Sequence, residues 1–338
     1  MGIHGHTLTR RRWIAGAAAA IGTPMLAACE RTLGGLFTAA DAHPADYPTV
    51  RAVEYVGRLL AERSGGRLGV KVYSGGQLGG EIDTLEITSF GGLDFTRVNL
   101  APLNSIAPLT IPASLPFVFR STEHMRRALD GEIGEEILAS LAPHGLIGLC
   151  FYDSGARSFY NTTRPIRTPE DMRGLKLRVP ASDLYVSMVN ALGANAVPIP
   201  YGEVYQALAQ GVIDGAENNW PSFESARHYE VAGYYSLSRH LLTPEVLVMS
   251  KHSWDRLSEG ERTLIRTAAR DSVSYMRKLW DERVAQSRAQ IVASGVEVNE
   301  LDTAGFAARM KSVWQAHVTT AAQARLVEQI VALEEPQP

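Results

Sequence analysis

The chain has 338 residues, of which 45% are apolar and 20% are charged, and its formal net charge is −3. This is the composition of a globular protein with about two domains, and the negative charge argues against nucleic acid as a partner, which would favour a basic face. There is no unbroken apolar run of ~18 residues that could span a membrane, and two cysteines, Cys29 and Cys150, are too few for a disulfide framework.

The first 28 residues have the features of an export signal. The basic cluster TRRRWI at residues 9–14 resembles a twin-arginine signal, and a short Ala-rich apolar stretch follows it. LAAC at residues 26–29 resembles the lipobox of bacterial lipoproteins, in which the signal is removed before a cysteine that becomes acylated. These motifs predict a signal peptide over residues 1–28, a periplasmic location and a lipid tether on Cys29. The alternative is cleavage after Ala42, which would release an untethered protein.

Strand and helix patterns alternate through the first half of the remaining chain. Helices are predicted near residues 48–64, 81–90, 121–130 and 135–141, between strands at 37–40, 68–73, 93–98 and 146–151. This order is typical of a parallel sheet built from right-handed βαβ units. The polar turn at 153–157 begins a second strand–helix series, so we place a domain crossover near Ser154.

The second series begins with a strand that carries an unusual charge. Leu175, Leu177 and Val179 alternate with Lys176 and Arg178, which is the period of a strand. Arg178 would lie at the carboxyl end of this strand, where open α/β sheets bind ligands, and its fork of donors matches a carboxylate. The alternatives are pairing with a structural acid or exposure to solvent.

Further elements of this series predict a return to the first domain. Helices are expected at 183–192 and 203–210, a short strand at 212–213, a helical segment ending near 229, and one long strand at 241–249. A helical pattern then runs from Ser258 to Ser294, ~55 Å at 1.5 Å per residue. That length suits a helix braced across two domains. The predicted fold is therefore α/β with two domains, domain I at 37–154 and 244–283 and domain II at 155–243 and 284–331.

No catalytic, metal or nucleotide motif is found. Ser154 lacks the first glycine of a nucleophile elbow, the histidines form no His-x-x-x-His pair, and the cysteines form no Cys-x-x-Cys pair. The glycine-rich turn at 75–80 matches neither nucleotide-binding pattern, and positive φ is the simpler reason for its glycines. We therefore predict no catalytic residue, no cofactor and no metal.

Polar side chains that follow predicted strands are the candidates for a binding site between the domains. In this interpretation two arginines clamp a carboxylate, two asparagines bind hydroxyls and a tryptophan covers the apolar face of a sugar ring. The alternatives are that His43 caps a turn, Trp220 belongs to the core and Glu217 is the counter-ion of an arginine. The candidates are Asp41, His43, Asn99, Arg157, Arg178, Glu217, Asn218 and Trp220.

Four blocks together resemble the solute-binding proteins of TRAP transporters, C4-dicarboxylate type. The blocks are DSGAR at 153–157, LKLRVP at 175–180, YGEVYQAL at 201–208 and DGAEN at 214–218. The resemblance runs from about 37 to 331 and implies two α/β domains that close about a hinge, a long helix spanning both, no catalysis, and membrane transporter subunits as partners. It also implies that Arg178 binds the ligand carboxylate bidentately, that Arg157 supports it and that Asn218 contacts the ligand.

The start at Asp41–Pro44, Asn99 and the turn at Asn218–Pro221 look like the branch of this family that binds sugar acids. A hexuronate such as D-glucuronate or D-galacturonate, with one carboxylate and several hydroxyls, suits these residues. The alternatives are a C4-dicarboxylate or another organic acid, an exported enzyme acting on sugar acids, or a ligand-sensing module that shares the same cleft.

Overall fold

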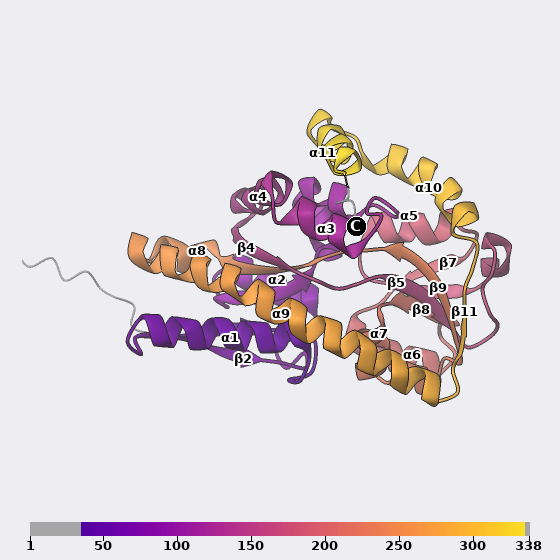
Figure 1. Cartoon of the computed structure of the whole chain (residues 1–338), viewed down its shortest axis with the longest axis horizontal. Helices are drawn as coiled ribbons and strands as arrows, with labels where there is room; N and C mark the ends of the chain where they lie inside the picture. The colour runs from indigo at the N-terminus through magenta and orange to yellow at the C-terminus, as the bar shows by residue number, and fades with distance from the viewer. Residues whose placement is uncertain (1–34, 335–338) are drawn as a thin grey trace, which may run out of the picture. The chain divides into compact units, whose positions relative to one another are not determined.

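The computed structural model describes residues 35–334, so the basic cluster, the lipobox and Cys29 lie outside the described residues. The described chain belongs to one compact unit and contains two sheets, each covered by helices (Figure 1). We call the parts around these sheets the first and second lobes. Across this range, no helix is both long and apolar enough to cross a membrane. The predicted α/β class is confirmed.

The first lobe is built on a five-stranded sheet of order β2-β1-β3-β10-β4. Its strands are β1 (Gly35–Ala40), β2 (Leu68–Tyr73), β3 (Phe95–Asn99), β4 (Leu146–Tyr152) and β10 (Glu245–Ser250). Four of them run in the same direction, whereas β10 runs antiparallel to its neighbours β3 and β4. Its helices are α1 (Pro48–Arg63), α2 (Glu81–Ser89), α3 (Thr122–Leu129), α4 (Glu132–Ala139) and α8 (Lys251–Asp255).

The second lobe is built on a six-stranded sheet of order β11-β9-β5-β8-β6-β7. The strands are β5 (Arg157–Asn161), β6 (Lys176–Val179), β7 (Asn195–Pro198), β8 (Gly215–Asn218), β9 (Tyr234–Leu241) and β11 (Glu297–Asn299). Its helices are α5 (Asp183–Ala191), α6 (Val204–Ala209), α7 (Trp220–Ser225) and α10 (Thr303–His317), which packs on α5 and β9. The last helix, α11 (Ala321–Ala332), lies against α4 (Figure 1).

Three predictions about the strands were wrong. Residues 212–213 form a turn that closes α6, with the Val212 amide donating to the Ala207 carbonyl, and the strand begins at Gly215. The expected strand at 241–249 is two strands, because Pro244 has no amide to donate and the chain changes sheets there. Both sheets are mixed rather than parallel, because the strand that the chain enters directly from the other lobe, β10 in the first sheet and β5 in the second, runs antiparallel to both of its neighbours.

Two short segments cross between the lobes side by side. One joins β4 to β5 and the other joins β9 to β10. Tyr152 is paired with Glu245 on one side of the crossing, and Arg157 is paired with Leu241 on the other. Because the two crossings lie next to each other, the residues that flank them in one lobe come close to those that flank them in the other.

A third crossing is made by α9 (Glu259–Ala293), which Figure 1 shows running past α1 and α7. Its 35 residues correspond to about 52 Å. A capping box begins it: the Ser258 hydroxyl accepts from the Glu261 amide while the Glu261 carboxylate accepts from the Ser258 amide. Trp280 joins the core of the first lobe and Ile291 that of the second. The predicted helix spanning both lobes is confirmed, whereas the domain boundaries stay a prediction.

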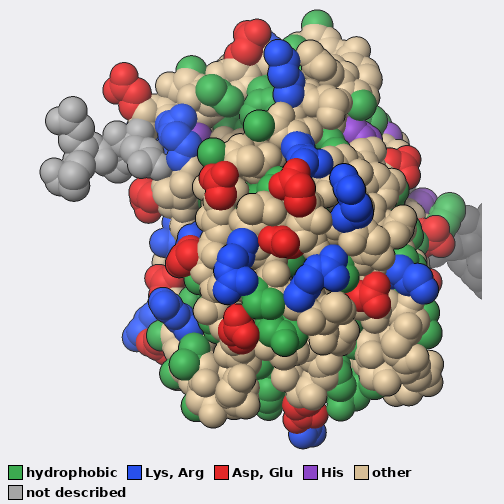
Figure 2. All heavy atoms as spheres, turned by 90° about the vertical axis from the view of Figure 1, so that its right-hand side faces the viewer, with side chains coloured by type: hydrophobic (Ala, Val, Ile, Leu, Met, Phe, Trp, Pro, Cys, Tyr) green, Lys and Arg blue, Asp and Glu red, His purple; other side chains and the backbone are tan. Residues whose placement is uncertain are grey.

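The surface carries charges of both signs. Figure 2 shows acidic and basic side chains interspersed across the face that lies at the right of Figure 1. Many of the charged side chains form exposed ion pairs, such as Arg239 with Glu300 at 2.8 Å. Such pairs contribute little to stability.

Gly155 lies where α9 packs on the first crossing, and its substitution tests that contact. Its φ is +59°, and a Cβ there would lie 3.2 Å from Trp280 atoms; Gly174 has φ +80° with nothing within 4 Å. We expect Gly174→Ala to lower the free energy of unfolding by about 1–2 kcal/mol from backbone strain alone. Gly155→Ala should lower the free energy of unfolding by about 1–3 kcal/mol more than Gly174→Ala does, because its new methyl group overpacks the contact with Trp280. Urea titration of both variants measures the difference, and equal losses would contradict close packing at the crossing.

Candidate functional site

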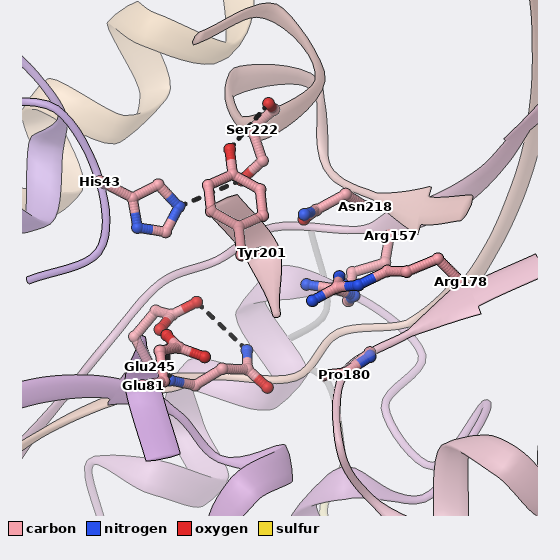
Figure 3. Close-up of a pocket in the computed structure, with 10 residues that line it drawn as sticks. His43, Glu81, Arg157, Arg178, Pro180, Tyr201, Asn218, Ser222 and Glu245 are labelled. Atoms are coloured by element: carbon pink, nitrogen blue, oxygen red, sulfur yellow. Dashed lines mark hydrogen bonds between the residues drawn. The ribbon is translucent and has the colours of Figure 1, made fainter. Parts of the chain in front are cut away.

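A pocket lined by polar residues lies between the lobes. The first lobe contributes polar residues near the ends of β1, β3 and β10 and the start of α2, and the second lobe contributes residues of β5, β6, β8 and α7. The lining residues are His43, Glu81, Asn99, Arg157, Arg178, Pro180, Tyr201, Asn218, Ser222 and Glu245 (Figure 3).

Arg178 is a buried arginine whose charge has no counter-ion. Its side chain lies at the carboxyl end of β6 and is only 4% exposed. Its Nε donates to the Ile199 carbonyl at 2.7 Å, and no carboxylate within residues 35–334 forms an ion pair with it. Burial lowers the pKa of Arg178 from its ordinary value, because a charged guanidinium loses its water. Its Nη1 and Nη2 atoms are therefore two donors available to an anion in the pocket.

Arg157 lies beside Arg178 in Figure 3 but is already paired. Its Nε and Nη2 donate to the two carboxylate oxygens of Glu217 at 2.6 and 2.7 Å, across the antiparallel strands β5 and β8. Burial by itself would raise the pKa of Glu217, but Arg157 lowers it to about 2. The pair is thus ionised and neutral overall, and it leaves Nη1 of Arg157 to face the pocket.

Asn218 supplies another donor on the same side. Its side-chain oxygen accepts from the Asn219 amide at 2.9 Å, and its carbonyl accepts from the Tyr235 hydroxyl at 2.9 Å. These contacts fix the side chain so that Nδ2 is left for the pocket. The second lobe therefore presents a group of donors with one uncompensated positive charge.

The opposite side of the pocket is acidic and is organised by Arg97, which is completely buried. This guanidinium binds Asp41 through Nε at 2.9 Å and Nη2, and through Nη1 it binds Glu81 at 2.8 Å and Glu245 at 2.6 Å. Asp41 is also held by the Thr49 hydroxyl at 2.9 Å. Although burial alone would raise the pKa of Asp41, Arg97 lowers it far below its ordinary value.

Glu81 and Glu245 share one nitrogen of Arg97 and differ in their free atoms. Both oxygens of Glu245 have donors, Arg97 on one and Asn99 Nδ2 on the other at 3.2 Å. Glu81 uses only Oε1, which accepts from Arg97 and from the Asn99 amide at 3.0 Å. Burial and the neighbouring charge of Glu245 raise the pKa of Glu81. No donor within the described chain reaches Glu81 Oε2, so this atom is an acceptor available to a ligand hydroxyl.

His43 connects the acidic side to α7. Its Nδ1 lies 2.5 Å from Arg97 Nη2 and 3.3 Å from Asp41 Oδ1. A guanidinium can only donate, so the shorter contact requires Nδ1 to be an acceptor and places the proton on Nε2. Nε2 then donates to the Ser222 hydroxyl at 3.4 Å, and Tyr47 contacts the same hydroxyl at 2.8 Å. This chain of contacts joins the two lobes next to the pocket.

The structure places the eight residues expected at the site in two groups. Five of them line the pocket: His43, Asn99, Arg157, Arg178 and Asn218. The other three lie behind it. Asp41 forms a buried ion pair with Arg97, and Glu217 forms one with Arg157. Trp220 stacks on Tyr235, with 4.2 Å between the ring centroids, at the core of the second lobe.

Several residues of the pocket and its support were not predicted from the sequence. Glu81 lies at the first position of a helix, where an acidic residue is common. Glu245 follows Pro244 within what was read as one continuous strand. A charged residue within an apolar strand was the signal for Arg97 and Glu245, the same signal that identified Arg178. The residues missed are Glu81, Arg97, Pro180, Tyr201, Ser222 and Glu245.

The described residues offer no candidate for a metal site or a reactive thiol. The described part of the chain contains no group of three or more His, Cys, Asp or Glu side chains arranged to hold a metal ion. Cys150 is buried in β4, and burial raises the pKa of its thiol to about 12, so it is an inert core residue.

Comparison with known proteins gives one consistent result. The family model for bacterial extracellular solute-binding proteins, family 7, matches residues 39–320. A solute-binding protein of Chromohalobacter salexigens is 48% identical over 277 residues, 82% of each chain.

Solved structures of similar proteins agree with this family match. A TRAP periplasmic solute-binding protein from Bradyrhizobium, in complex with α/β-D-galacturonate, is 52% identical, with a TM-score of 0.87 over 88% of this chain and 100% of its own. Another from Chromohalobacter salexigens, with bound D-glucuronate, is 46% identical, with a TM-score of 0.85 over 87% of this chain and 99% of its own.

The pair between Arg157 and Glu217 generates a prediction about stability. Glu217→Gln leaves a buried guanidinium without its partner and should lower the free energy of unfolding by about 3–5 kcal/mol. The exposed pair partner Glu300→Gln is the matched control, with a loss below about 1 kcal/mol. Because the pKa of Glu217 is lowered by folding, its contribution is complete above its unfolded value near 4.5 and is lost as pH falls toward about 2. Urea titrations at pH 7 and pH 3 measure both effects, and a Glu217→Gln loss as large at pH 3 as at pH 7 would contradict the ionised pair.

Proposed function

Because the chain belongs to the bacterial extracellular solute-binding proteins of family 7, we propose that it captures a hexuronate in the pocket between its lobes and delivers it unchanged to the membrane subunits of a TRAP transporter. The observation that carries the choice of ligand is the polarity of the pocket. Donors with one uncompensated positive charge lie on one side, and carboxylates lie on the other (Figure 3).

The donor side fits one carboxylate. Arg178 offers two parallel donors, which bind a carboxylate bidentately, and Arg157 Nη1 and Asn218 Nδ2 lie near it in Figure 3. Since Glu217 already neutralises Arg157, the ligand has to neutralise only Arg178. A ligand with one negative charge satisfies this side completely.

The acidic side distinguishes a sugar acid from a dicarboxylate. A second carboxylate would lie toward Glu81 and Glu245, and like charges at close range disfavour binding. A hydroxyl can instead donate to Glu81 Oε2. The bound galacturonate of the Bradyrhizobium protein and the bound glucuronate of the Chromohalobacter protein support this ligand class.

Three further properties, predicted from the family and from the N-terminal motifs, belong to the same proposal. The lobes would close on the ligand about the paired crossings at 153–156 and 242–244, with domain I at 37–154 and 244–283 and domain II at 155–243 and 284–331. The protein would act in the periplasm without turning its ligand over. A signal over residues 1–28 and a lipid on Cys29 would tether it to a membrane.

Removal of Arg178 tests the donor side. In Arg178→Met we expect D-glucuronate and D-galacturonate to bind about 2–5 kcal/mol more weakly, because the ligand carboxylate loses its charged partner. The unliganded variant should be no less stable than the wild type, because the lost charge had no counter-ion. Arg239→Met, on the surface, is the control. Calorimetry and urea titration measure the two effects, and unchanged affinity would remove Arg178 from the site.

Glu81→Gln tests the acidic side. The change removes the negative charge of Glu81, which would repel a second ligand carboxylate. It also replaces the carboxylate acceptor of a ligand hydroxyl by a weaker amide acceptor. We expect uronate affinity to fall about tenfold, since a hydrogen bond to a charged group contributes about 1.5–3 kcal/mol, and the preference over succinate to shrink. Glu62→Gln, at an exposed position of α1, is the control. Thermal shifts and calorimetry with glucuronate, galacturonate and succinate give the result. Wild-type protein that binds succinate more tightly than either uronate would overturn the proposed ligand class, and recovery of altered ligand would revive the enzyme alternative.

A further inference from the structure

A second cavity continues from the pocket toward the outside of the cleft. It shares Glu81, Arg178, Pro180 and Tyr201 with the pocket. Residues 80–83 and Pro102 of the first lobe form one wall, and residues 180–181 and 198–201 of the second lobe form the other. The two cavities therefore meet at Arg178, the residue that we assign to the carboxylate.

This second cavity, here called the proline groove, is much less polar than the pocket. Its wall contains Ile82 and Ile199, and Ile82 is 44% exposed. Four prolines also contribute, and a proline has no amide with which to bind a hydroxyl. They are Pro102, Pro180, Pro198 and Pro200.

Charge in the proline groove excludes some occupants. Besides Arg178, which serves the pocket, its charged residues are Glu81 and Asp83, and Asp83 already accepts from the Gly80 amide at 2.8 Å. A second acidic group would face these carboxylates without a partner. An uncharged apolar group would instead bury surface against the prolines and Ile82, which is favourable by roughly 25 cal/mol per Å².

The covalent structure of a uronic acid connects the two cavities. In the pyranose ring the carbon that bears the carboxylate is bonded to the ring oxygen, which is bonded to the anomeric carbon. This edge has no hydroxyl on the ring oxygen and is the least polar edge of the sugar. A sugar whose carboxylate binds Arg178 and whose remaining hydroxyls point to the acidic side of the pocket can turn this edge and the anomeric oxygen toward the proline groove, because Arg178 lines both cavities.

We propose that the proline groove binds an apolar group attached to the anomeric oxygen, so that the ligands of this protein include O-glycosides of uronic acids with uncharged, apolar aglycones as well as the free acids. This inference rests on the proposed function, because it needs the carboxylate at Arg178. The aglycone would be held between the lobes, with Ile82 on one side and Pro198 on the other.

The test compares four ligands by calorimetry on the whole protein: D-glucuronate, methyl β-D-glucuronide, phenyl β-D-glucuronide and phenyl β-D-glucoside. We expect phenyl glucuronide to bind about tenfold or more tightly than methyl glucuronide, because the ring buries apolar surface. The phenyl glucoside, which lacks the carboxylate, should not bind. Equal affinities of the two glucuronides, or binding of the free acid with no binding of either glucuronide, would overturn the proposal and leave the proposed function intact. No binding of any uronic acid would instead reject the proposed function.

Two substitutions locate the effect in the proline groove. Ala181 is exposed and lines the groove without lining the pocket, so Ala181→Trp should fill it. We expect this variant to lose phenyl glucuronide affinity at least tenfold while glucuronate affinity stays within twofold. Ile82→Ser should reduce the preference for phenyl over methyl glucuronide severalfold. Val212→Ser is the matched control, because Val212 is an apolar side chain, 52% exposed, that lies elsewhere. Unchanged phenyl preference in both groove variants would overturn the assignment.

Discussion

The buried ion pair between Arg157 and Glu217 determines how much uncompensated charge the pocket carries. Two arginines lie side by side in the pocket, and burial of both charges without partners would be very costly. Glu217, on the neighbouring strand β8, neutralises Arg157 through two hydrogen bonds. Arg178 therefore remains as one uncompensated positive charge. Under the proposed function, this pairing leaves Arg178 as the charged partner of a single ligand carboxylate.

The position of the pocket follows from the way in which the chain passes between its lobes. Arg157 begins β5 and Glu245 begins β10, so each lies at one end of a crossing segment. The donor side of the pocket belongs to one lobe and the acidic side to the other. A ligand that contacts both sides adds bonds between the lobes, and its binding energy then favours the closed arrangement. The long helix α9 contacts both lobes and packs Trp280 against Gly155 at the first crossing.

Arg97 neutralises buried charge on the acidic side of the pocket, as Glu217 does on the donor side. It holds Asp41, Glu81 and Glu245 at one place and lets three carboxylates share one buried cation. All oxygens of Asp41 and Glu245 are occupied by donors, which leaves Glu81 Oε2 for the ligand. The adjoining proline groove begins at the same Glu81. Residues that never touch the ligand thus decide which atoms remain free for it.

The sequence by itself determined those features that depend on neighbours along the chain. The period-2 pattern predicted the strand of Arg178, the Ser258–Glu261 capping box predicted the start of α9, and four short blocks identified the family. Only the tertiary structure decided which charges pair. Asp41 and Arg97 are 56 residues apart and Arg97 and Glu245 are 148 apart, so no local pattern reports their contact. The same holds for Trp220, whose stacking on Tyr235 withdraws it from the pocket, because ion pairing and packing depend on distances in space that the order of residues does not contain.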